Sequence, residues 1–294
     1  MNGGKDRGEG GTKGMDRVAT IDTVRGLREA VASWRRAGER VALVPTMGAL
    51  HEGHLSLVER ARQLADRVVV SIFVNPTQFA PNEDFSKYPR TLDDDCARLA
   101  GLAELAYTPL VEEMYPPGFA TTVSLDGPAA AGLEDAFRPT HFAGVATVVA
   151  KLLLQALPDV AIFGEKDYQQ LKVIARMTRD LDLSAEIVGA PTVREADGLA
   201  LSSRNRYLSD EERALAPTLH RTLQDCAARL RAGEDAGAVV AAGEDVLAAA
   251  GFAVDYLALR DAETLAPVSG LAAPARLLVA ARLGATRLID NIAA

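Results

Sequence analysis

Two histidines, His51 and His54, stand three residues apart in the stretch VPTMGALHEGHLSLVERA at 44–61. Imidazole rings can hydrogen-bond phosphate oxygens, and they do so more strongly when negative charge builds up on those oxygens in a transition state. Gly48 and Gly53 lie in the same stretch, and residues without a side chain let the backbone approach a ligand closely. The combination predicts a binding site for nucleotide phosphates.

Capping, zinc binding and the common glycine-rich loops explain the histidine pair less well. A single histidine at a helix start is most often a capping or surface residue, but two in one turn are harder to explain in that way. A zinc protease helix needs H-E-x-x-H, so the H-E-G-H spacing here does not favour a zinc site. The stretch also lacks the Lys-Ser/Thr end of a P-loop and the G-x-G-x-x-G of a dinucleotide loop.

The elements around the pair are predicted from hydrophobic spacing. Residues 40–44 form a short apolar run, and apolar residues then recur at roughly helical spacing at Leu55, Leu57, Val58, Ala61 and Leu64. This pattern predicts a strand, a tight glycine turn and a helix that begins at the histidines. The start of a helix presents unpaired N–H groups and the positive end of the helix dipole, which favours a bound anion.

A second strand should lie beside the first. Residues 67–75, RVVVSIFVN, form the continuous apolar run of a doubly covered parallel strand, and strand, helix and strand begin a βαβ fold. Ligands collect beyond the carboxyl ends of such strands, so Asn75 and Gln78 should face the same crevice as the histidines. A plain polar turn, which Asn-Pro favours, is the alternative for this segment.

Three further segments place charge near this crevice. Lys166 follows the predicted strand 160–164 and is well placed to neutralise a pyrophosphate, while Arg138 and His141 precede a predicted helix. Loop 194–207 offers two hydroxyls and a guanidinium that could clamp a triphosphate, at Ser202, Ser203 and Arg204. Asp167 and Gln170 have the spacing of a helix capping pair, which is their structural alternative.

The remaining pattern completes an α/β chain. Helices are predicted at 23–36, where Trp34 fills the core, at 143–157 and after 164 to 180, with strands at 104–109 and 186–193. Residues 83–95 are predicted as a lid-like loop that leads into a helix near Leu92. Acids in a first helical turn are favourable, so this is a better explanation than a metal site for Asp93, Asp94 and Asp95.

The C-terminal part has a different composition and should form its own domain. A capping box at Ser209 and Glu212 predicts a helix to about 231, in which His220 is structural, followed by an Ala-rich helix at 235–250 and strands at 253–260, 276–282 and 286–290. The expected division is a disordered Gly-rich tail at 1–14, a Rossmann-like nucleotide-binding domain at 15–192, and a smaller α+β domain at 193–294. In this arrangement the smaller domain forms a lid over the nucleotide site.

Composition limits the classes of function. The 294 residues are 48% hydrophobic and 24% charged with a net charge of −8, which is typical of a globular protein and argues against nucleic acid or an anionic membrane as a partner. Cys96 and Cys226 are too few and too far apart to indicate a disulfide framework or a metal cluster. No run of about 18 apolar residues and no signal core is present, which predicts a soluble cytoplasmic protein.

Seven ordered stretches give the chain a specific resemblance: PTMGALHEGH, FVNPTQF, YPRTLDDD, YPPGF, FRPTHFAGV, FGEKDYQQL and READGLALSSRNRYL. Together they resemble the pantothenate synthetase family, the pantoate–β-alanine ligases of the nucleotidyltransferase superfamily with an HxGH motif. The resemblance covers essentially the whole chain after Met15. It implies a ligase in which pantoate attacks the α-phosphate of ATP to give pantoyl adenylate and pyrophosphate, and β-alanine then displaces AMP to give pantothenate.

The resemblance also implies roles for individual residues. It assigns catalysis to His54, as proton donor, with His51, Lys166 and Arg204, and it places pantoate at Gln78 and Gln170, with Gln78 also near β-alanine. The implied ATP-binding residues are Met47, Gly48, Ala49, Leu50, His51, Glu52, Gly53, His54, Gly164, Glu165, Lys166, Asp167, Val193, Leu201, Ser202, Ser203 and Arg204. Leu201 replaces the Met that is common in relatives, a change of similar volume. Tyr88, Arg138 and His141 are left as lid or supporting groups.

The resemblance further implies Mg²⁺ carried on the ATP phosphates, with no protein ligand predicted for it, and a homodimer.

Two different functions are the alternatives to a pantoate–β-alanine ligase. Another HxGH nucleotidyltransferase, such as a pantetheine-phosphate adenylyltransferase, would keep the AMP group in its product, but it would leave the Ala-rich C-terminal part unexplained. A non-catalytic nucleotide-binding protein would not need His51, His54, Lys166 and Arg204 together.

Overall fold

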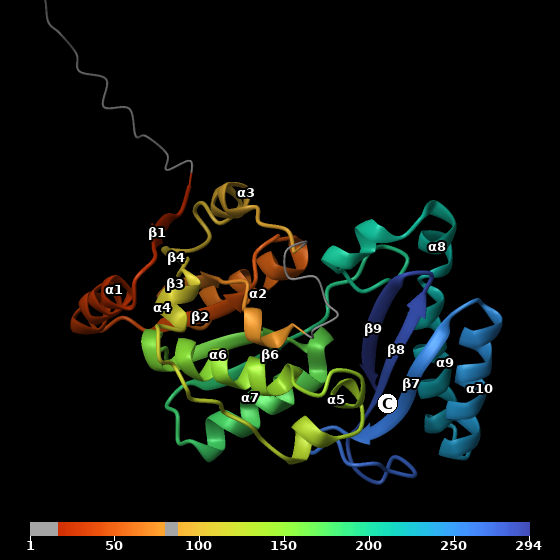
Figure 1. Cartoon of the computed structure of the whole chain (residues 1–294). Helices are drawn as coiled ribbons and strands as arrows, with labels where there is room; N and C mark the ends of the chain where they lie inside the picture. Colours follow the sequence, from red (N-terminus) through yellow and green to blue (C-terminus); the bar gives the residue numbers. More distant parts are fainter. Residues whose placement is uncertain (1–16, 80–87) are drawn as a thin grey trace, which may run out of the picture.

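A computed structural model describes residues 17–79 and 88–294 of the chain. The predicted tail at 1–14 and residues 83–87 of the predicted lid-like loop lie outside the described residues. The described chain contains a six-stranded sheet in the order β1-β4-β3-β2-β5-β6 and a three-stranded sheet in the order β7-β8-β9 (Figure 1). This arrangement confirms the predicted parallel α/β sheet with a smaller C-terminal α+β part.

The first sheet is parallel throughout. Its strands are β1 (Ala19–Ile21), β2 (Val41–Thr46), β3 (Arg67–Ile72), β4 (Leu105–Tyr107), β5 (Val160–Gly164) and β6 (Glu186–Ala190). Strand β2 pairs with β3 on one side and with β5 on the other, so the chain changes direction across the sheet at β2. In open α/β sheets such a switch point opens a crevice at the carboxyl ends of the strands, where ligands bind.

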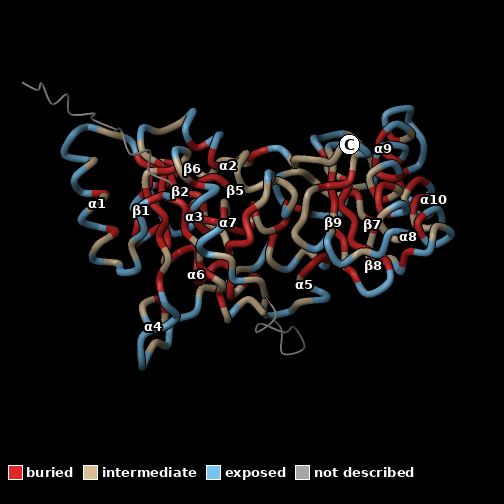
Figure 2. The backbone as a smooth tube through the Cα atoms, turned by 90° about the horizontal axis from the view of Figure 1, so that it is seen from above, coloured by how far each residue is buried: buried red, intermediate tan, exposed pale blue. Residues whose placement is uncertain are grey.

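Helices cover both faces of this sheet. On one face lie α1 (Val24–Arg36), α6 (His141–Ala156) and α7 (Tyr168–Asp180), which share one hydrophobic cluster. On the other lie α2 (Glu52–Arg62) and α3 (Leu92–Arg98), which share a second cluster. Figure 2 shows that the strands are largely buried, whereas exposed residues lie along α1 and the outer loops. Two single-turn helices, α4 (Val111–Met114) and α5 (Glu134–Phe137), lie in the connection between β4 and α6.

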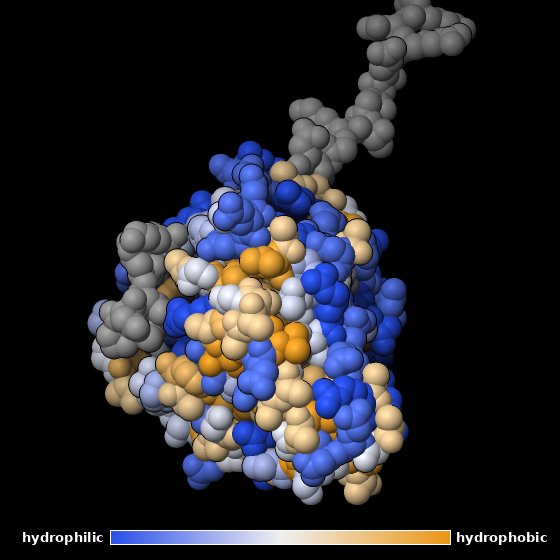
Figure 3. Space-filling model, turned by 90° about the vertical axis from the view of Figure 1, so that its right-hand side faces the viewer, coloured by the Kyte–Doolittle hydropathy of each residue, from blue (hydrophilic) through white to orange (hydrophobic). Residues whose placement is uncertain are grey.

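The C-terminal part is built on an antiparallel sheet of β7 (Ala253–Asp261), β8 (Ala275–Leu283) and β9 (Thr286–Ala293). Helices α9 (Thr218–Arg231) and α10 (Ala236–Ala249) share a hydrophobic cluster with this sheet. Leu278 of β8 belongs instead to a cluster of the first domain, so the two parts pack against each other. Figure 3 shows the side of the molecule that this part forms, where hydrophobic and hydrophilic side chains are mixed.

Several predicted boundaries were wrong. The single helix expected from 209 to about 231 is two helices, α8 (Asp210–Leu215) and α9, because Pro217 lies between them and has no N–H to continue the ladder. The predicted capping box of Ser209 and Glu212 is present at the start of α8. Strands β3 and β6 end about three residues early, and the three-residue edge strand β1 was not predicted because it is too short to show a period.

Within 17–79 and 88–294, the helices are all too short or too polar to cross a bilayer. The two cysteines are free and buried, as expected for residues outside any disulfide framework.

Candidate active site

The carboxyl ends of β2, β3 and β5 lie side by side because these strands are parallel neighbours. A cavity of about 240 Å³ opens there. The predicted site residues that line it are Met47, His51, Gly53, His54, Gln78, Gly164, Lys166, Asp167, Gln170, Val193, Leu201, Ser202, Ser203 and Arg204. Asn75 and Tyr88 also line it. Segments far apart in the sequence therefore meet in one place, as the strand-end argument predicts.

The two histidines form the start of α2. His51 is the N-cap residue, and its Nδ1 accepts a hydrogen bond from the Gly53 amide at 3.1 Å. In return the Nδ1 of His54 accepts from the His51 amide at 3.4 Å, so the pair forms a capping box. The ring centroids are 4.1 Å apart. Capping, the structural alternative for a histidine here, is thus present, and it accounts for only one nitrogen of each ring.

These contacts decide where the ring protons lie. A nitrogen that accepts a hydrogen bond carries no proton, so each neutral ring holds its proton on Nε2. The pKa of His54 is lowered to about 3, mainly by burial and to a smaller extent by the neighbouring His51 and Lys166. Burial, with Lys166 and Arg206, also lowers the pKa of His51. Both rings are therefore neutral near pH 7, and each offers one Nε2–H donor.

Gly53 is required by the position of the His51 ring. A Cβ atom on Gly53 would lie 2.9 Å from Cε1 and 3.0 Å from Nδ1 of that ring. Contacts below 3.0 Å are essentially never made by real Cβ atoms, so any side chain at this position displaces the imidazole. The glycine between the two histidines is thus part of the site's geometry.

The turn before α2 is held by Asp95, whose role was not predicted. Asp95 is buried, and its carboxylate accepts hydrogen bonds from the amides of Ala49 at 3.0 Å and Leu50 at 2.7 Å. Gly48 and Ala49 both have positive φ angles, 83° and 51°, which this carboxylate helps to maintain. The expected placement of Asp93, Asp94 and Asp95 in the first turn of α3 is confirmed. That placement alone did not predict the hydrogen bonds of Asp95 to the turn before α2.

Five of the predicted ATP-binding residues do not line the cavity: Gly48, Ala49, Leu50, Glu52 and Glu165. The amides of Ala49 and Leu50 are occupied by Asp95, as described above. Glu52 is exposed and lies 3.5 Å from Arg98, and Glu165 forms an ion pair with Arg276 at 2.9 Å. None of the five presents a side chain to the cavity.

The segment after β3 is more than a polar turn. The Asn75 amide donates to Gln78 Oε1 and to the carbonyl of Gly144 in α6, both at 3.2 Å. The carbonyl of Gln78 accepts from His141 Nδ1 at 3.0 Å. A Cβ on Gly144 would lie 2.4 Å from the Thr77 carbonyl oxygen, so only glycine allows α6 to approach this segment. The contacts fix Gln78 at the cavity wall.

His141 and Arg138 support Gln78 from behind. His141 donates from Nδ1, so its Nε2 is the acceptor for Arg138 Nη1 at 3.2 Å. The pKa of His141 is lowered to about 4, mainly by burial and to a smaller extent by the adjacent Arg138. The ring is neutral near pH 7. Of the two roles left open for these residues, the contacts favour that of a supporting group.

The turn after β5 carries Lys166 on a short 3-10 helix, Glu165–Asp167, that leads into α7. Lys166 is largely buried, and its Nζ lies 4.0 Å from Asp167. The predicted capping pair of Asp167 and Gln170 was wrong: Asp167 is the N-cap residue of α7, but its side chain makes no capping hydrogen bond. Its φ and ψ of −93° and 61° differ from the extended geometry in which caps usually bond. Asp167 and Gln170 both face the cavity.

The third wall is the loop after β6. An isolated bridge joins Arg194 to Ala200, and the amide of Leu201 donates to the carbonyl of Val193 at 2.9 Å. Ser202 caps the following 3-10 helix by accepting from the amide of Arg204 at 3.2 Å. Arg204 itself is exposed and lines the cavity. The two hydroxyls and the guanidinium expected to form a clamp therefore line the same cavity as Lys166.

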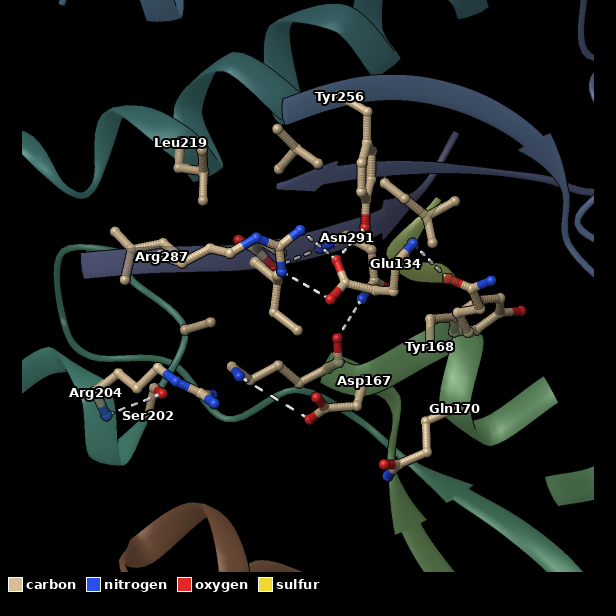
Figure 4. Close-up of a pocket in the computed structure, with 18 of the residues that line it drawn as sticks. Glu134, Asp167, Tyr168, Gln170, Ser202, Arg204, Leu219, Tyr256, Arg287 and Asn291 are labelled. Carbon is tan, nitrogen blue, oxygen red and sulfur yellow. Dashed lines mark hydrogen bonds and ion pairs between the residues drawn. The ribbon is translucent and has the colours of Figure 1, made fainter. Parts of the chain in front are cut away.

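A second cavity of about 280 Å³ adjoins the first and shares Lys166, Asp167, Gln170, Ser202 and Arg204 with it (Figure 4). It lies between the two parts of the chain. A buried bidentate pair spans it, in which Arg287 of β9 binds Glu134 at 2.7 and 2.8 Å and Tyr256 donates to the same carboxylate at 2.9 Å. These residues were not predicted, because nothing in their local sequence marks a contact between distant segments.

His220, expected to be structural, lies beside Asp290 of β9 at 3.5 Å, and Arg194 binds the same carboxylate in a bidentate pair. In the described part of the chain, no group of three or more histidine, cysteine, aspartate or glutamate residues is arranged to hold a metal ion.

Comparisons with known proteins agree with this geometry. Residues 19–293 match the family model described as pantoate-beta-alanine ligase. A pantothenate synthetase from Nitrobacter hamburgensis is 60% identical over 276 residues, which cover 93% of this chain and 98% of the relative. One from Rhodopseudomonas palustris is 60% identical over 92% of this chain and 96% of the relative.

Solved structures show the same similarity. The pantothenate synthetase of Thermus thermophilus superposes with a TM-score of 0.87 at 52% identity, covering 94% of this chain and 99% of that one. A pantoate-beta-alanine ligase from Francisella tularensis, complexed with beta-gamma ATP and beta-alanine, superposes with a TM-score of 0.78 at 32% identity over 94% and 97% of the two chains. The sequence match, the shared fold and the cavity at the strand ends agree, and the chain belongs to the pantoate–β-alanine ligase family.

Proposed function

We propose that this chain joins (R)-pantoate to β-alanine with ATP and releases AMP and pyrophosphate. The observation that carries the proposal is that His51, His54 and Lys166 line one cavity in a chain of this family. In the first step a carboxylate oxygen of pantoate attacks the α-phosphorus of ATP, forming pantoyl adenylate and expelling pyrophosphate. In the second the deprotonated amine of β-alanine attacks the acyl carbon, forms the amide bond and expels AMP. Neither step needs a protein nucleophile.

Stabilisation of charge on the phosphates is the main task of the protein in this reaction. Lys166 and Arg204 supply positive charge, and the neutral rings of His51 and His54 each supply an Nε2–H donor. The resemblance implies that His54 is a proton donor. Because both rings are neutral, we propose that His54 instead donates a hydrogen bond and keeps its proton. Loss of one well-placed donor of this kind typically lowers kcat about 10²- to 10³-fold.

We propose that ATP lies along the strand ends. The residues proposed to contact it through side chains or backbone are Met47, His51, Gly53, His54, Gly164, Lys166, Asp167, Val193, Leu201, Ser202, Ser203 and Arg204. We keep Gly48, Ala49, Leu50, Glu52 and Glu165 in the ATP site as residues that shape its walls. The support is their place in the turns after β2 and β5.

We place pantoate in the part of the same cavity that Gln78 and Gln170 line. Gln78 and Gln170 offer carboxamides that can donate to its carboxylate and hydroxyls. The adjoining wall is apolar, with Val145, Val149 and Leu152 of α6, and it suits the two methyl groups of pantoate. We place β-alanine beside Gln78.

Mg²⁺ enters this proposal as an ion bound to the ATP phosphates. The described residues contain no cluster of carboxylates that would form a protein-based site, and Asp167 is the carboxylate that faces the cavity. Hard oxygen ligands on the phosphates suit Mg²⁺, which is commonly held in this way with few protein ligands. The ion would neutralise part of the phosphate charge.

Three further features of the proposal rest on membership of the family. Residues 193–294 form a smaller domain that closes over ATP as a lid, the chain acts in the cytoplasm, and two copies form a homodimer. Light scattering after size exclusion tests the last point, since a dimer has twice the 31.2 kDa mass of the chain. A mass near 31 kDa at micromolar concentration contradicts it.

Exchange of labelled pyrophosphate into ATP tests the reaction. We expect exchange only when pantoate is present, and release of AMP when β-alanine is added. Exchange without pantoate would indicate another nucleotidyltransferase, and ATP binding with no exchange under any condition would indicate a non-catalytic nucleotide-binding protein. We expect His54→Ala to lower the exchange rate at least about 10²-fold with the fold retained. Arg25→Ala, at a fully exposed position, is the control.

A further inference from the structure

Asn291 joins the second sheet to the turn that carries Lys166. It lies in β9, is 2% exposed, and its Nδ2 donates to the carbonyls of both Glu165 and Lys166 at 2.9 Å. Its Oδ1 accepts from Arg276 Nε at 2.7 Å. Every polar atom of the carboxamide has a partner, so the orientation of the amide is fixed.

Arg276 holds the same turn from its side. Its Nη2 binds the Glu165 carboxylate at 2.9 Å, and its guanidinium lies 4.0 Å from the ring centroid of Tyr168, the first residue of α7. In Figure 4 Asn291 projects from its strand toward the segment of Asp167 and Tyr168. The residues on both sides of Lys166 are therefore attached to the second sheet.

The turn depends on these contacts because it has no cap of its own. Neither Gly164 before the 3-10 helix nor Asp167 before α7 makes a side-chain capping bond. Among the described residues, Asn291 is the side-chain donor to both carbonyls, so its loss would remove two hydrogen bonds from a part-buried turn. The backbone at Lys166 would then be held less firmly.

We propose that Asn291 is a positioning residue for the ligase reaction, which aims the Lys166 ammonium at the β- and γ-phosphates of ATP. The inference rests on the proposed function for the identity of the ligand. The preceding residue of β9, Asp290, forms the bidentate pair with Arg194 at the base of the loop that carries Arg204. One strand thus contacts both of the segments that bring cations to the cavity.

Ligand binding provides the test, with adenosine and β,γ-methylene ATP as probes. We expect Asn291→Ala to weaken binding of the triphosphate by about 10-fold or more and to leave adenosine binding unchanged, because Lys166 acts on the phosphates alone. Tyr256→Phe is the matched control, since it removes another buried hydrogen bond between the two parts of the chain without touching the Lys166 turn. We expect the control to bind both probes normally.

A double-mutant cycle makes the assignment specific. In a Lys166→Ala background, Asn291→Ala should weaken triphosphate binding by less than about 2-fold, because the residue that it positions is absent. Additive losses, or an equal loss for adenosine and the triphosphate, would overturn the proposal. If Asn291→Ala does not fold, Asn291→Asp keeps the shape and the Arg276 contact but removes both donors, and it must show the same selective loss.

The two proposals can fail separately. If the wild-type chain exchanges no pyrophosphate with pantoate, the proposed function is wrong. The probe-binding cycle still decides whether Asn291 acts through Lys166.

Discussion

Replacing Gly53 by alanine tests the geometry of the histidine pair with one methyl group. The new Cβ would lie 2.9 Å from Cε1 of the His51 ring, whereas ordinary contacts begin near 3.4 Å. The ring must therefore move by about 0.5 Å, the difference of the two distances, or the helix start must shift by a similar amount. Either movement breaks or bends the hydrogen bond from the Gly53 amide to His51 Nδ1.

The two effects of Gly53→Ala on the free energy of unfolding nearly cancel. Loss of that hydrogen bond lowers the free energy of unfolding by about 1 kcal/mol, and replacement of a helical glycine by alanine raises it by up to about 1 kcal/mol. No opposing effect restores the rate of catalysis, because a displacement of about 1 Å at a reacting centre can lower the rate about 10²-fold. We expect Gly53→Ala to lower pantoate-dependent pyrophosphate exchange roughly 10- to 100-fold, while the unfolding free energy changes by less than about 1 kcal/mol.

The assay pairs exchange rates with urea unfolding, and Gly237→Ala is the control. Gly237 is the second residue of α10, as Gly53 is the second residue of α2, and each helix has a capping side chain before it. A Cβ on Gly237 would lie 3.3 Å from Asp235 Oδ1, and α10 lines neither cavity of the site. The control should therefore retain wild-type exchange.

Normal exchange by Gly53→Ala would refute the reasoning, because the His51 ring could then be displaced without consequence. Loss of exchange together with a loss of several kcal/mol in stability would also count against it, since the methyl group would then act on the fold and not on the ring. Equal loss of activity in the Gly237 control would show that the assay reports helix stability alone.

Three other predictions follow from individual contacts. The pKa of His54 is lowered to about 3 in the folded state from 6.5, so the unfolded chain binds the extra proton first and stability falls as pH drops below 6.5. His54 should contribute about 1 kcal/mol to the loss of unfolding free energy between pH 7 and 5.5, beside the contributions of His51 and His141, whose pKa values are also lowered, and in urea unfolding His54→Asn should remove that share alone. Asp95→Ala leaves two buried amides unpaired and should lower unfolding free energy by roughly 3 kcal/mol, and a Tm within experimental error of wild type argues against the contact. His141→Ala frees the carbonyl of Gln78 and should raise the KM for pantoate about 10-fold with little change in the KM for ATP, and equal changes in both would contradict that role.

The sequence predicted site residues well where reactive side chains lie next to a strand or helix that hydrophobic spacing predicts. His51 and His54 are adjacent to a predicted strand and helix, so their place at a helix start followed from hydrophobic spacing. Lys166 and Gln78 follow strands of the same sheet. Because ligands collect at the carboxyl ends of such strands, both residues were predicted to face one crevice. Residues of the cavity at the switch point are thus predictable from the order of elements.

Contacts between distant segments were not predictable in this way. Asp95 supports a turn 45 residues earlier, and Asn291 reaches a turn 125 residues away. Neither has a local signature, because the first looks like an acid in a helical turn and the second like any polar residue in a strand. Asp167 shows the opposite failure: it has the sequence spacing of a cap, but its backbone geometry leaves the carboxylate unused for capping.

The contacts also change how the charge of the site should be understood. A histidine pair beside phosphates suggests two imidazolium ions, but both Nδ1 atoms accept backbone hydrogen bonds and both pKa values are lowered, with burial as the main cause. In the proposed reaction, the positive charge that offsets the triphosphate would then come from Lys166, Arg204 and the proposed Mg²⁺, while the histidines would supply oriented dipoles. Neutral donors do not bind a ground-state anion as strongly as cations do, and their hydrogen bonds strengthen as charge develops on the phosphate oxygens. Capping therefore serves the reaction, because the same bonds that start α2 keep both rings in the donor tautomer.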